Sequence, residues 1–390
     1  MWRASATPFL PSVAPPRWPA IGLVPSRVNG GWKVFLSATG HELAALGWSA
    51  VALAVGEAAV WQTSQSAGAA VTPEVRPWQS RRPPSRILAI RLQAIGDVVI
   101  TLPYLGALGR LLPSTEIDFM TRDETAEVPR AVRLFARIDA LGGRRNERLQ
   151  LALALARGPQ LLARRYDVVI DLQNNRVSRT LTRMARPRAW STFDRESLVS
   201  AGERTRRAIA AAGFPLARVE AGFDLHHSTV GEDLLRAVGW DARRPLVVLS
   251  PAGGFPSRNW PLDRYVQFAE QWRGRHHAQF AVLGIGRLAD KAAVLSRALG
   301  SDLLNLVGRT RGDEAFAIVR RASLVLTEDS GLMHMAWTSG APTLALFGST
   351  RHAWSTPLGP HTLCLHSGDL ECGSCMDAEC RFGDVHCLTR

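Results

Sequence analysis

Short apolar runs alternate with helix-like segments from about residue 86 onward. The first run, 87–92, is followed by a polar loop at 93–97 and then by an apolar-periodic stretch that ends near residue 112. This pattern predicts a strand, a tight loop and a helix. Further strand-like runs occur at 116–120, 166–172, 246–249, 279–283, 323–327 and 343–348. Strands and helices that alternate in this way predict an α/β fold with mostly parallel sheets.

The strand-like runs form two series that separate near residues 240–245. We therefore expect two Rossmann-like domains, one over residues 86–243 and one over residues 244–390. In such sheets, ligands bind beyond the carboxyl ends of the strands. The polar residues that directly follow each strand are therefore the first candidates for a functional site.

Residues 1–85 have a different character, with Pro-Pro pairs, scattered tryptophans and an Ala-rich stretch. No period holds over this region apart from a helix-like pattern at about 41–61, so we expect an N-terminal extension of low order. Its longest apolar stretch, about 14 residues from Leu43 to Gly56, is too short to span a membrane. Prolines interrupt residues 1–20, which therefore make a poor signal peptide.

The chain carries a net charge of +13, and nearly all of its positive charge is arginine, since Lys33 and Lys291 are the only lysines. A polyanionic partner would explain this charge, and so would a GC-rich coding sequence. No arginine run alternates with aromatic residues as in nucleic-acid-binding modules, so we expect no nucleic-acid partner. All 5 cysteines lie in the last 27 residues, and a chain otherwise without cysteine suits a reducing compartment.

The strongest candidate motif runs from Glu328 to His334, after one predicted strand and before a helix. Asp329 and Ser330 are typical helix-capping residues, and Gly331 would let the backbone approach a ligand. The free N–H groups of the new helix would favour a phosphate or a developing negative charge. The alternative is an ordinary strand-to-helix turn with His334 facing the core.

Two further loops follow predicted strands. In 250–261, exposed amides of Gly253 and Gly254 together with the guanidinium of Arg258 would form a diphosphate cradle. Gly-Gly loops after strands are common, so this motif is weak on its own. In the first loop, Asp97 is placed either to act as a general base or to cap the helix that it begins.

Four cysteines lie close together near the C-terminus: Cys372, Cys375, Cys380 and Cys387. Four thiols with this spacing could hold a structural zinc ion. Disulfides or a cluster of free thiols are the alternatives. A catalytic role for these cysteines is the least favoured interpretation.

These motifs, in this order, resemble glycosyltransferase family 9, the ADP-heptose:lipopolysaccharide heptosyltransferases. The matching stretches are 87–103, 166–174, 250–261, 305–310, 329–336 and 342–350, followed by the C-terminal cysteines. The resemblance covers residues 86–390. Each motif alone is weak, whereas seven in the family's order are specific.

The resemblance implies a GT-B fold, in which two Rossmann-like domains face a cleft. It also implies an inverting, metal-independent transfer of a heptose or related sugar, with no cofactor required for catalysis. The donor would be a nucleotide-diphosphate sugar such as ADP-heptose, and the acceptor an anionic lipopolysaccharide core or lipid A-type molecule. Such an enzyme is expected in the cytoplasm, with peripheral contact at the inner membrane.

The resemblance also assigns roles to individual residues. It makes Asp97 the base that deprotonates the acceptor hydroxyl, and it places Arg258, where the family usually has lysine, on the donor diphosphate. The motif around the donor sugar and phosphates maps to Asp329, Ser330, Gly331 and His334, with serine in place of the commoner threonine.

Two departures from the family pattern affect the donor site. Gly253 and Gly254 replace hydroxyl residues in the phosphate loop, so backbone amides must serve there. The acidic residue expected to hold the ribose has no clear equivalent, and Asp290 is our choice. For an acidic acceptor the candidates are the arginines at 176–188, unless they form only a solvated helix face: Arg176, Arg179, Arg183, Arg186 and Arg188.

Two other functions fit parts of this pattern. A GT-B sugar-nucleotide hydrolase or epimerase would share the fold but would need no acceptor. A non-catalytic basic protein that binds polyanions would show binding that weakens steeply with salt and ignores nucleotide sugars.

Overall fold

The computed structural model describes residues 75–144, 146–227 and 229–389, and the backbone of three short strands nearer the N-terminus. These strands, β1 (Leu23–Val28), β2 (Gly31–Leu36) and β3 (His41–Leu43), form an antiparallel sheet. The expected extension and the helix-like pattern at 41–61 otherwise lie outside the described residues, and 41–43 is strand rather than helix. Between β1 and β2 the sequence reads Asn29-Gly30, a strong hairpin signal that our sequence analysis missed.

The first large sheet has five parallel strands in the order β6-β5-β4-β7-β8. Its strands are β4 (Arg86–Ile90), β5 (Glu116–Arg122), β6 (Arg137–Leu141), β7 (Val168–Asp171) and β8 (Ala189–Thr192). Its helices are α1 (Ile95–Leu111), η1 (Asp123–Thr125), α2 (Glu127–Arg130), α3 (Glu147–Ala156), α4 (Gly158–Arg164), α5 (Arg176–Ala185) and α6 (Ala201–Ala211).

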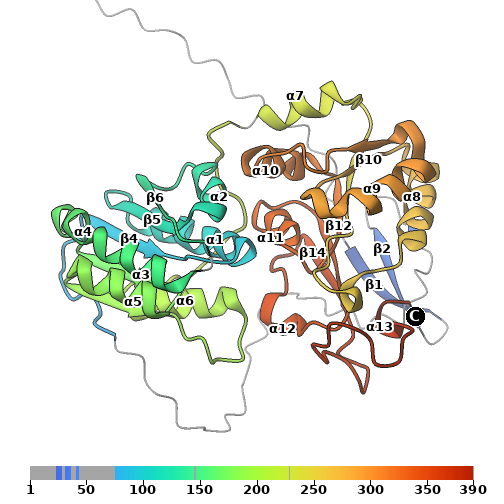
Figure 1. The fold of residues 1–390 in the computed structure, drawn as a ribbon. Coiled ribbons are helices and arrows are strands. Elements are labelled where there is room, and N and C mark those ends of the chain that lie inside the picture. The colour runs from blue at the N-terminus through green and yellow to red at the C-terminus, as the bar shows by residue number, and fades with distance from the viewer. Residues whose placement is uncertain are drawn as a thin grey trace, which may run out of the picture.

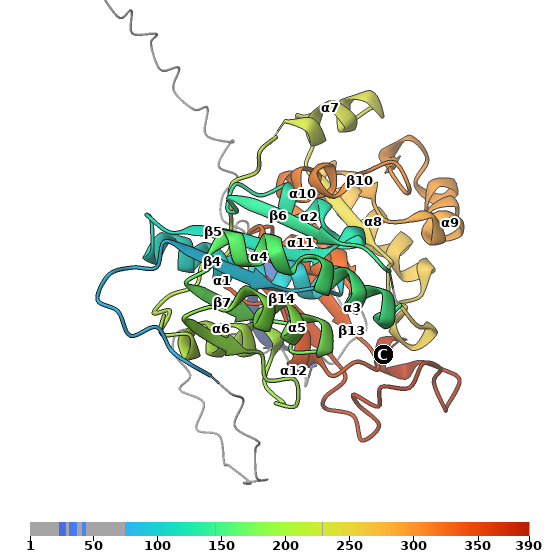
Figure 2. The ribbon, with the colours of Figure 1, turned by 60° about the vertical axis from the view of Figure 1, so that its left-hand side comes forward.

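Alternation of side chains along β4 assigns these helices to the two faces of the sheet. Ile87 and Ala89 belong to the core that includes α1 and α6. Leu88 and Ile90 belong to a separate core with α3, α4 and α5. These three helices therefore form one layer, which lies in front of the sheet in Figure 2.

The second large sheet has six parallel strands in the order β11-β10-β9-β12-β13-β14. They are β9 (Leu246–Ser250), β10 (Gln279–Val282), β11 (Leu303–Asn305), β12 (Leu324–Glu328), β13 (Thr343–Phe347) and β14 (Thr362–His366). The remaining helices are α7 (Val230–Ala237), η2 (Pro256–Arg258), α8 (Leu262–His276), η3 (Gly286–Leu288), α9 (Ala289–Leu299), η4 (Gly300–Asp302), α10 (Gly312–Arg321), α11 (Gly331–Thr338), α12 (His352–Ser355) and α13 (His386–Thr389).

Both sheets have the strand order of a doubly wound α/β fold, and this confirms the predicted fold class. In the first sheet β4 lies between β5 and β7, and in the second β9 lies between β10 and β12. Each of these positions is a switch point, where the chain turns from one half of the sheet to the other. The predicted boundary at 243/244 falls between α7 and β9, although α7 already packs against α10 of the second half.

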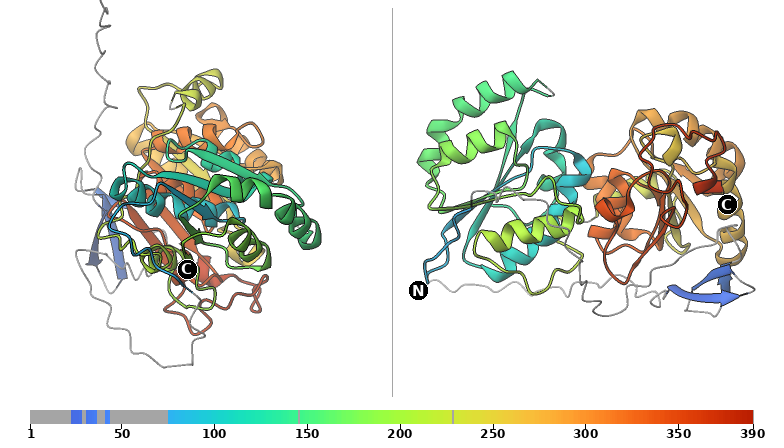
Figure 3. Two further views of the ribbon diagram at one scale, coloured as in Figure 1. Left: turned by 90° about the vertical axis from the view of Figure 1, so that its left-hand side faces the viewer. Right: turned by 90° about the horizontal axis from the view of Figure 1, so that it is seen from below.

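The two halves lie side by side and meet where α1 faces α11 (Figures 1 and 3). Two glycines permit this approach. A methyl group on Gly96 would lie 2.8 Å from Cδ2 of His334, and one on Gly331 would lie 2.7 Å from Cγ2 of Ile95. The starts of the two helices are therefore packed against each other with no room for larger side chains.

Among the described residues, no helix combines the length and the apolar character needed to cross a bilayer.

Candidate functional site

The candidate residues lie at the two switch points of the fold. Asp97 follows β4, the loop with Arg258 follows β9, and Asp329 follows β12. The carboxyl ends of these parallel strands are where α/β sheets bind ligands. Because α1 packs against α11, residues that the sequence separates by more than 200 positions are brought together.

Asp97 is the third residue of α1, and its side chain is 39% exposed. Its Oδ2 accepts a hydrogen bond from the N–H of Ala94 at 3.0 Å and lies 2.9 Å from Nη2 of Arg91. The capping alternative is thus partly correct, since Asp97 helps to cap the helix from its third position. Both contacts fall on Oδ2.

Two arginines that the sequence analysis missed surround Asp97. Arg91 is buried and donates a hydrogen bond to the carbonyl of Leu172. The guanidinium of Arg91 lies 4.7 Å from the ring centre of Phe193, and that of Arg204 lies 4.8 Å from it. Burial lowers the pKa of Arg204, and the positive charge of Arg91 lowers it further. The surroundings of Asp97 are therefore strongly positive.

In the donor motif, Asp329 pairs with Arg258. Its Oδ2 lies 3.4 Å from Nη1 of Arg258, and both side chains are largely buried. The guanidinium of Arg258 also lies 4.7 Å from the ring centre of Phe255. Ser330 is the N-cap of α11, because its Oγ accepts the N–H of Met333 at 3.3 Å. The capping prediction is confirmed for Ser330, while Asp329 is used for the ion pair.

His334 is buried between the two helix starts. Its Nδ1 accepts a hydrogen bond from the indole N–H of Trp337 at 3.0 Å, and an indole nitrogen can only donate. Burial lowers the pKa of His334, and the nearby carboxylates of Asp329 and Asp97 oppose this only in part. The ring is therefore neutral with its proton on Nε2, and its Cδ2 edge is the one that faces Gly96.

A buried carboxylate organises the loop after β9. Glu328 accepts the N–H of Gly253 on Oε2 and the N–H of Trp260 on Oε1, both at 2.7 Å. The amide of Gly253 is therefore buried and occupied, contrary to our expectation of an exposed amide. Glycine is required there, because a Cβ would lie 2.6 Å from the carbonyl oxygen of Arg258. Gly254 is exposed, as predicted.

Two basic side chains hold the same loop from the other side. Nη2 of Arg287 donates to the carbonyl of Ala252 at 3.0 Å, and Nζ of Lys291 donates to that of Pro251 at 2.8 Å. Our sequence analysis assigned neither residue to the site. Asp290, our choice for a ribose contact, lies between them in sequence and is exposed on the first turn of α9. None of the contacts above involves it.

The arginines proposed for the acceptor extend along α5. Arg176 begins this helix close to the carboxyl end of β7, whereas Arg186 and Arg188 follow its other end, where β8 starts. Since helix and strand run in opposite directions in such units, Arg176 and Arg179 lie towards the edge of the sheet that carries Asp97, and Arg186 and Arg188 lie towards the opposite edge.

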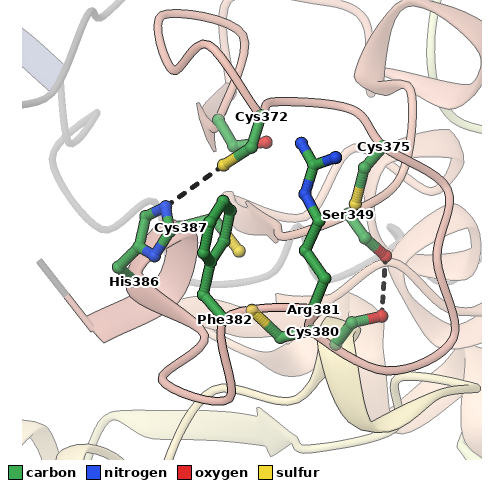
Figure 4. Close-up of a pocket in the computed structure, with 10 residues that line it drawn as sticks. Ser349, Cys372, Cys375, Cys380, Arg381, Phe382, His386 and Cys387 are labelled. Atoms are coloured by element: carbon green, nitrogen blue, oxygen red, sulfur yellow. Dashed lines mark hydrogen bonds between the residues drawn. The ribbon is translucent and has the colours of Figure 1, made fainter.

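The four C-terminal cysteines line one pocket (Figure 4). The Sγ of Cys372 lies 3.1 Å from Nε2 of His386, and burial together with the neighbouring thiols raises the pKa of Cys387 to about 11. Within the described part of the chain, no three His, Cys, Asp or Glu side chains stand close enough to share a metal ion. The cysteines are therefore gathered but not arranged as ligands, and a structural zinc stays a prediction.

The cysteine-rich tail is attached to the turn that carries Arg258. The N–H of Ser257 donates to the carbonyl of Ala378 at 3.2 Å, and its Oγ lies 2.8 Å from Oγ of Ser349. The N–H of Met376 in turn donates to the carbonyl of Ser349 at 2.8 Å. A change in the conformation of the tail would therefore move Ser257 and, with it, the adjacent Arg258.

Glu328 makes the stability of this loop dependent on pH. Burial raises its pKa from 4.5 to about 7, although Lys291 and two backbone amides favour the charged form. Because the pKa of Glu328 is higher in the folded state, its protonation adds to the free energy of unfolding. This contribution is fully present below pH 4.5 and is lost as the pH rises through about 7. Between pH 5 and pH 8 we expect the wild type to lose on the order of 2–3 kcal/mol more unfolding free energy than Glu328→Gln.

Denaturant unfolding at the two pH values measures this difference. Glu270→Gln, which changes an exposed carboxylate on α8, serves as the control and should keep the wild-type pH dependence. An identical pH dependence in wild type and Glu328→Gln would contradict the account of the buried carboxylate.

Comparison with known proteins places the chain in a family. The model of glycosyltransferase family 9 (heptosyltransferase) matches residues 154–386. Lipopolysaccharide heptosyltransferase 1 of Pseudomonas aeruginosa is 27% identical over 332 residues, which cover 76% of this chain and 88% of that protein.

Two solved structures share the fold. The family 9 glycosyltransferase from Veillonella parvula has a TM-score of 0.65 at 18% identity, over 73% of this chain and 86% of that one. The ADP-heptose lipopolysaccharide heptosyltransferase II of E. coli has a TM-score of 0.58 at 19% identity, over 72% and 90%. The chain is thus a glycosyltransferase with the GT-B fold and belongs to glycosyltransferase family 9, the heptosyltransferases.

Proposed function

We propose that this enzyme transfers a heptose, with inversion, from ADP-heptose to a lipopolysaccharide core or lipid A-type acceptor without a catalytic metal ion. The observation that carries the proposal is the packing of α1 on α11, which brings the carboxylates of Asp97 and Asp329 close enough to interact with the ring of His334, while Asp329 also pairs with Arg258. The relatives named above, lipopolysaccharide and ADP-heptose heptosyltransferases, support this choice of acceptor and donor.

On the donor side, positive charge has to meet the leaving diphosphate. Arg258 supplies a guanidinium whose fork suits phosphate oxygens, and the free N–H groups at the start of α11 add to it. The partner Asp329 holds Arg258 in place until a donor arrives. Groups fixed in this way stabilise charge that develops in the transition state without reorganisation.

On the acceptor side, Asp97 takes the proton. Oδ2 is occupied by Ala94 and Arg91, so Oδ1 is the oxygen that would receive the proton of the acceptor hydroxyl. The hydroxyl oxygen then forms its bond to the anomeric carbon from the face opposite the diphosphate, which leaves with the bonding electron pair. Such general-base catalysis contributes about 10²–10⁴-fold to the rate.

The acceptor is carried by a membrane lipid in this proposal, so the enzyme would act at the cytoplasmic face of the inner membrane. Arg91 and Arg204 give the acceptor side a positive field that suits an anionic core. Arg176, at the exposed start of α5, lies along the same edge of the sheet, with its Nε 4.0 Å from Oε1 of Glu147.

For the cysteine-rich tail we propose a structural role, with zinc as the metal that it would hold. Thiolates are the ligands zinc prefers, and the four cysteines share one pocket, although their side chains would have to turn to reach one ion. The tail would act on the donor site by holding the Ser257 turn, and would take no part in the chemistry.

Substitutions at Asp97 and Arg258 separate turnover from donor binding. We expect Asp97→Asn to lower kcat by about 10²–10⁴-fold while the donor Kd stays within about twofold, because the lost group only accepts a proton. We expect Arg258→Ala to weaken donor binding by at least about tenfold, and Arg258→Lys to retain most of it. Calorimetry with ADP-heptose and a transfer assay measure the two quantities.

Two exposed positions away from the site serve as controls. Glu116→Gln and Arg243→Ala should leave both quantities unchanged. Equal loss of donor binding in Asp97→Asn and Arg258→Ala would contradict the division of roles. Salt-sensitive binding of polyanions without any response to nucleotide sugars would favour a binding protein instead.

Substitution of two tail cysteines tests the structural role of the tail. In a Cys380→Ser/Cys387→Ser variant we expect weaker donor binding and a nearly unchanged kcat at saturating donor, because only the support of Arg258 is lost. Elemental analysis should find about one zinc per wild-type chain and none in the variant. Cys364→Ala, outside the pocket, is the control. A metal-free wild type would overturn the zinc assignment, and unchanged donor affinity would overturn the supporting role.

A further inference from the structure

The outward face of α3 and α4 is unusually apolar. Gln150, Ala154 and Leu161 point towards the sheet and are buried. On the opposite side of the two helices, Leu149, Leu155 and Leu162 are 48%, 56% and 40% exposed. Scattered exposed leucines are ordinary, but these three lie within 14 residues of one another on the outward side of one helix pair. We call these three residues the leucine stripe.

Ala and Pro side chains fill the gaps in this stripe. Ala152, Ala156, Pro159 and Ala163 are all exposed and recur at the spacing of a helix face. No charged residue lies between Arg148 and Arg157. The first turn of α3 is charged, and the remaining outward face of the helix offers no group that water would solvate well.

Arginines border the leucine stripe. Residues 144–188 contain eleven arginines and three acidic residues, an excess that supplies most of the chain's net charge of +13. The arginine rim consists of those that are exposed and, among the described residues, form no ion pair with a carboxylate within 4 Å: Arg144, Arg148, Arg165, Arg179, Arg183 and Arg186.

The stripe and the rim belong to one layer. Helix α5, which carries Arg179 and Arg183 and is followed by Arg186, packs against both α3 and α4. A Cβ on Gly158 would lie 2.2 Å from Cε of Met184, which shows how closely α4 and α5 approach. Figure 2 shows the three helices together over the first sheet, on the face opposite α1 and α6.

We propose that the leucine stripe and the arginine rim form a docking surface for an anionic phospholipid bilayer. The leucines would enter the boundary between headgroups and acyl chains, and the guanidinium groups would contact lipid phosphates. The docking surface rests on the proposed function, because it would bring the enzyme to its lipid-linked acceptor. A protein docked in this way carries Asp97 at one edge of the docked sheet, beside the surface that presents a lipid-linked acceptor.

Other occupants fit this surface less well. A second copy that pairs through the same face would bring two arginine rims together, and like charges would oppose the contact. Residues 1–74 contain four basic and three acidic residues, so they offer no complementary charge. A nucleic acid would leave the leucines exposed, and the stripe has no aromatic side chain for bases to stack on.

Co-sedimentation of the full chain with vesicles tests the proposal. We expect binding to vesicles of phosphatidylglycerol and phosphatidylethanolamine, weaker binding at high salt, and little binding to pure phosphatidylcholine. Leu155→Glu/Leu162→Glu should weaken binding by at least about tenfold. Arg183→Gln/Arg186→Gln should weaken it by about fivefold for each arginine removed.

Leu111→Glu is the matched control. Leu111 is 50% exposed, like the stripe leucines, but it ends α1 on the opposite face of the sheet. Its substitution should leave vesicle binding unchanged. Calorimetry with ADP-heptose and thermal unfolding then check that each variant is folded.

Several results would overturn the docking surface. The wild type would fail to bind anionic vesicles, or Leu155→Glu/Leu162→Glu would bind them as tightly as the wild type does. A third such result is that Leu111→Glu loses as much vesicle binding as the leucine variant. A dimer in light scattering that Leu155→Glu/Leu162→Glu dissociates would assign the surface to a second copy instead. Vesicle binding requires neither the donor nor sugar transfer. An absence of vesicle binding would therefore leave the proposed transfer reaction unaffected. An absence of transfer activity would likewise leave the result of the vesicle experiment valid.

Discussion

The contact between the start of α1 and the start of α11 is the constraint on which the site depends. Gly96 and Gly331 leave space for the edge of His334 and for Ile95, and any Cβ at either glycine would need that space. Because each helix follows a central strand of its own sheet, this single contact joins the two switch points. Asp97 and the donor motif, which lie far apart in the sequence, then become neighbours of the neutral side chain of His334.

Buried charge fixes the donor side around this contact. Glu328 binds the amides of Gly253 and Trp260 and so determines the path of the loop that ends in Arg258. Burial desolvates its carboxylate and raises its pKa, and Lys291 offsets only part of that penalty. The ion pair of Arg258 with Asp329 then sets the guanidinium beside the N-terminus of α11. Rigidity of this kind lets fixed groups meet a diphosphate without reorganisation.

The sequence allowed the central strands and the two-sheet fold to be predicted, but it did not reveal β6, β8, β11 and β14. These four are the edge strands of the two sheets. An edge strand is paired on one side and tolerates polar residues, as in β6, where Arg137 and Asp139 pair with each other at 2.7 Å. Asp97, Arg258 and Asp329 were found because they follow strands. The hydrogen bond from the N–H of Gly253 to Glu328 was not predicted, because the two residues lie 75 positions apart in the sequence.

The central claim is that this arrangement transfers a heptose to an acceptor. The most direct measurement incubates the enzyme with ADP-heptose and a heptose-free lipopolysaccharide precursor, and follows ADP release together with the mass of the acceptor. The account predicts one heptosyl unit gained by the acceptor for each ADP released, and no release when the acceptor is omitted. ADP release with no gain in acceptor mass would contradict it and would indicate a sugar-nucleotide hydrolase.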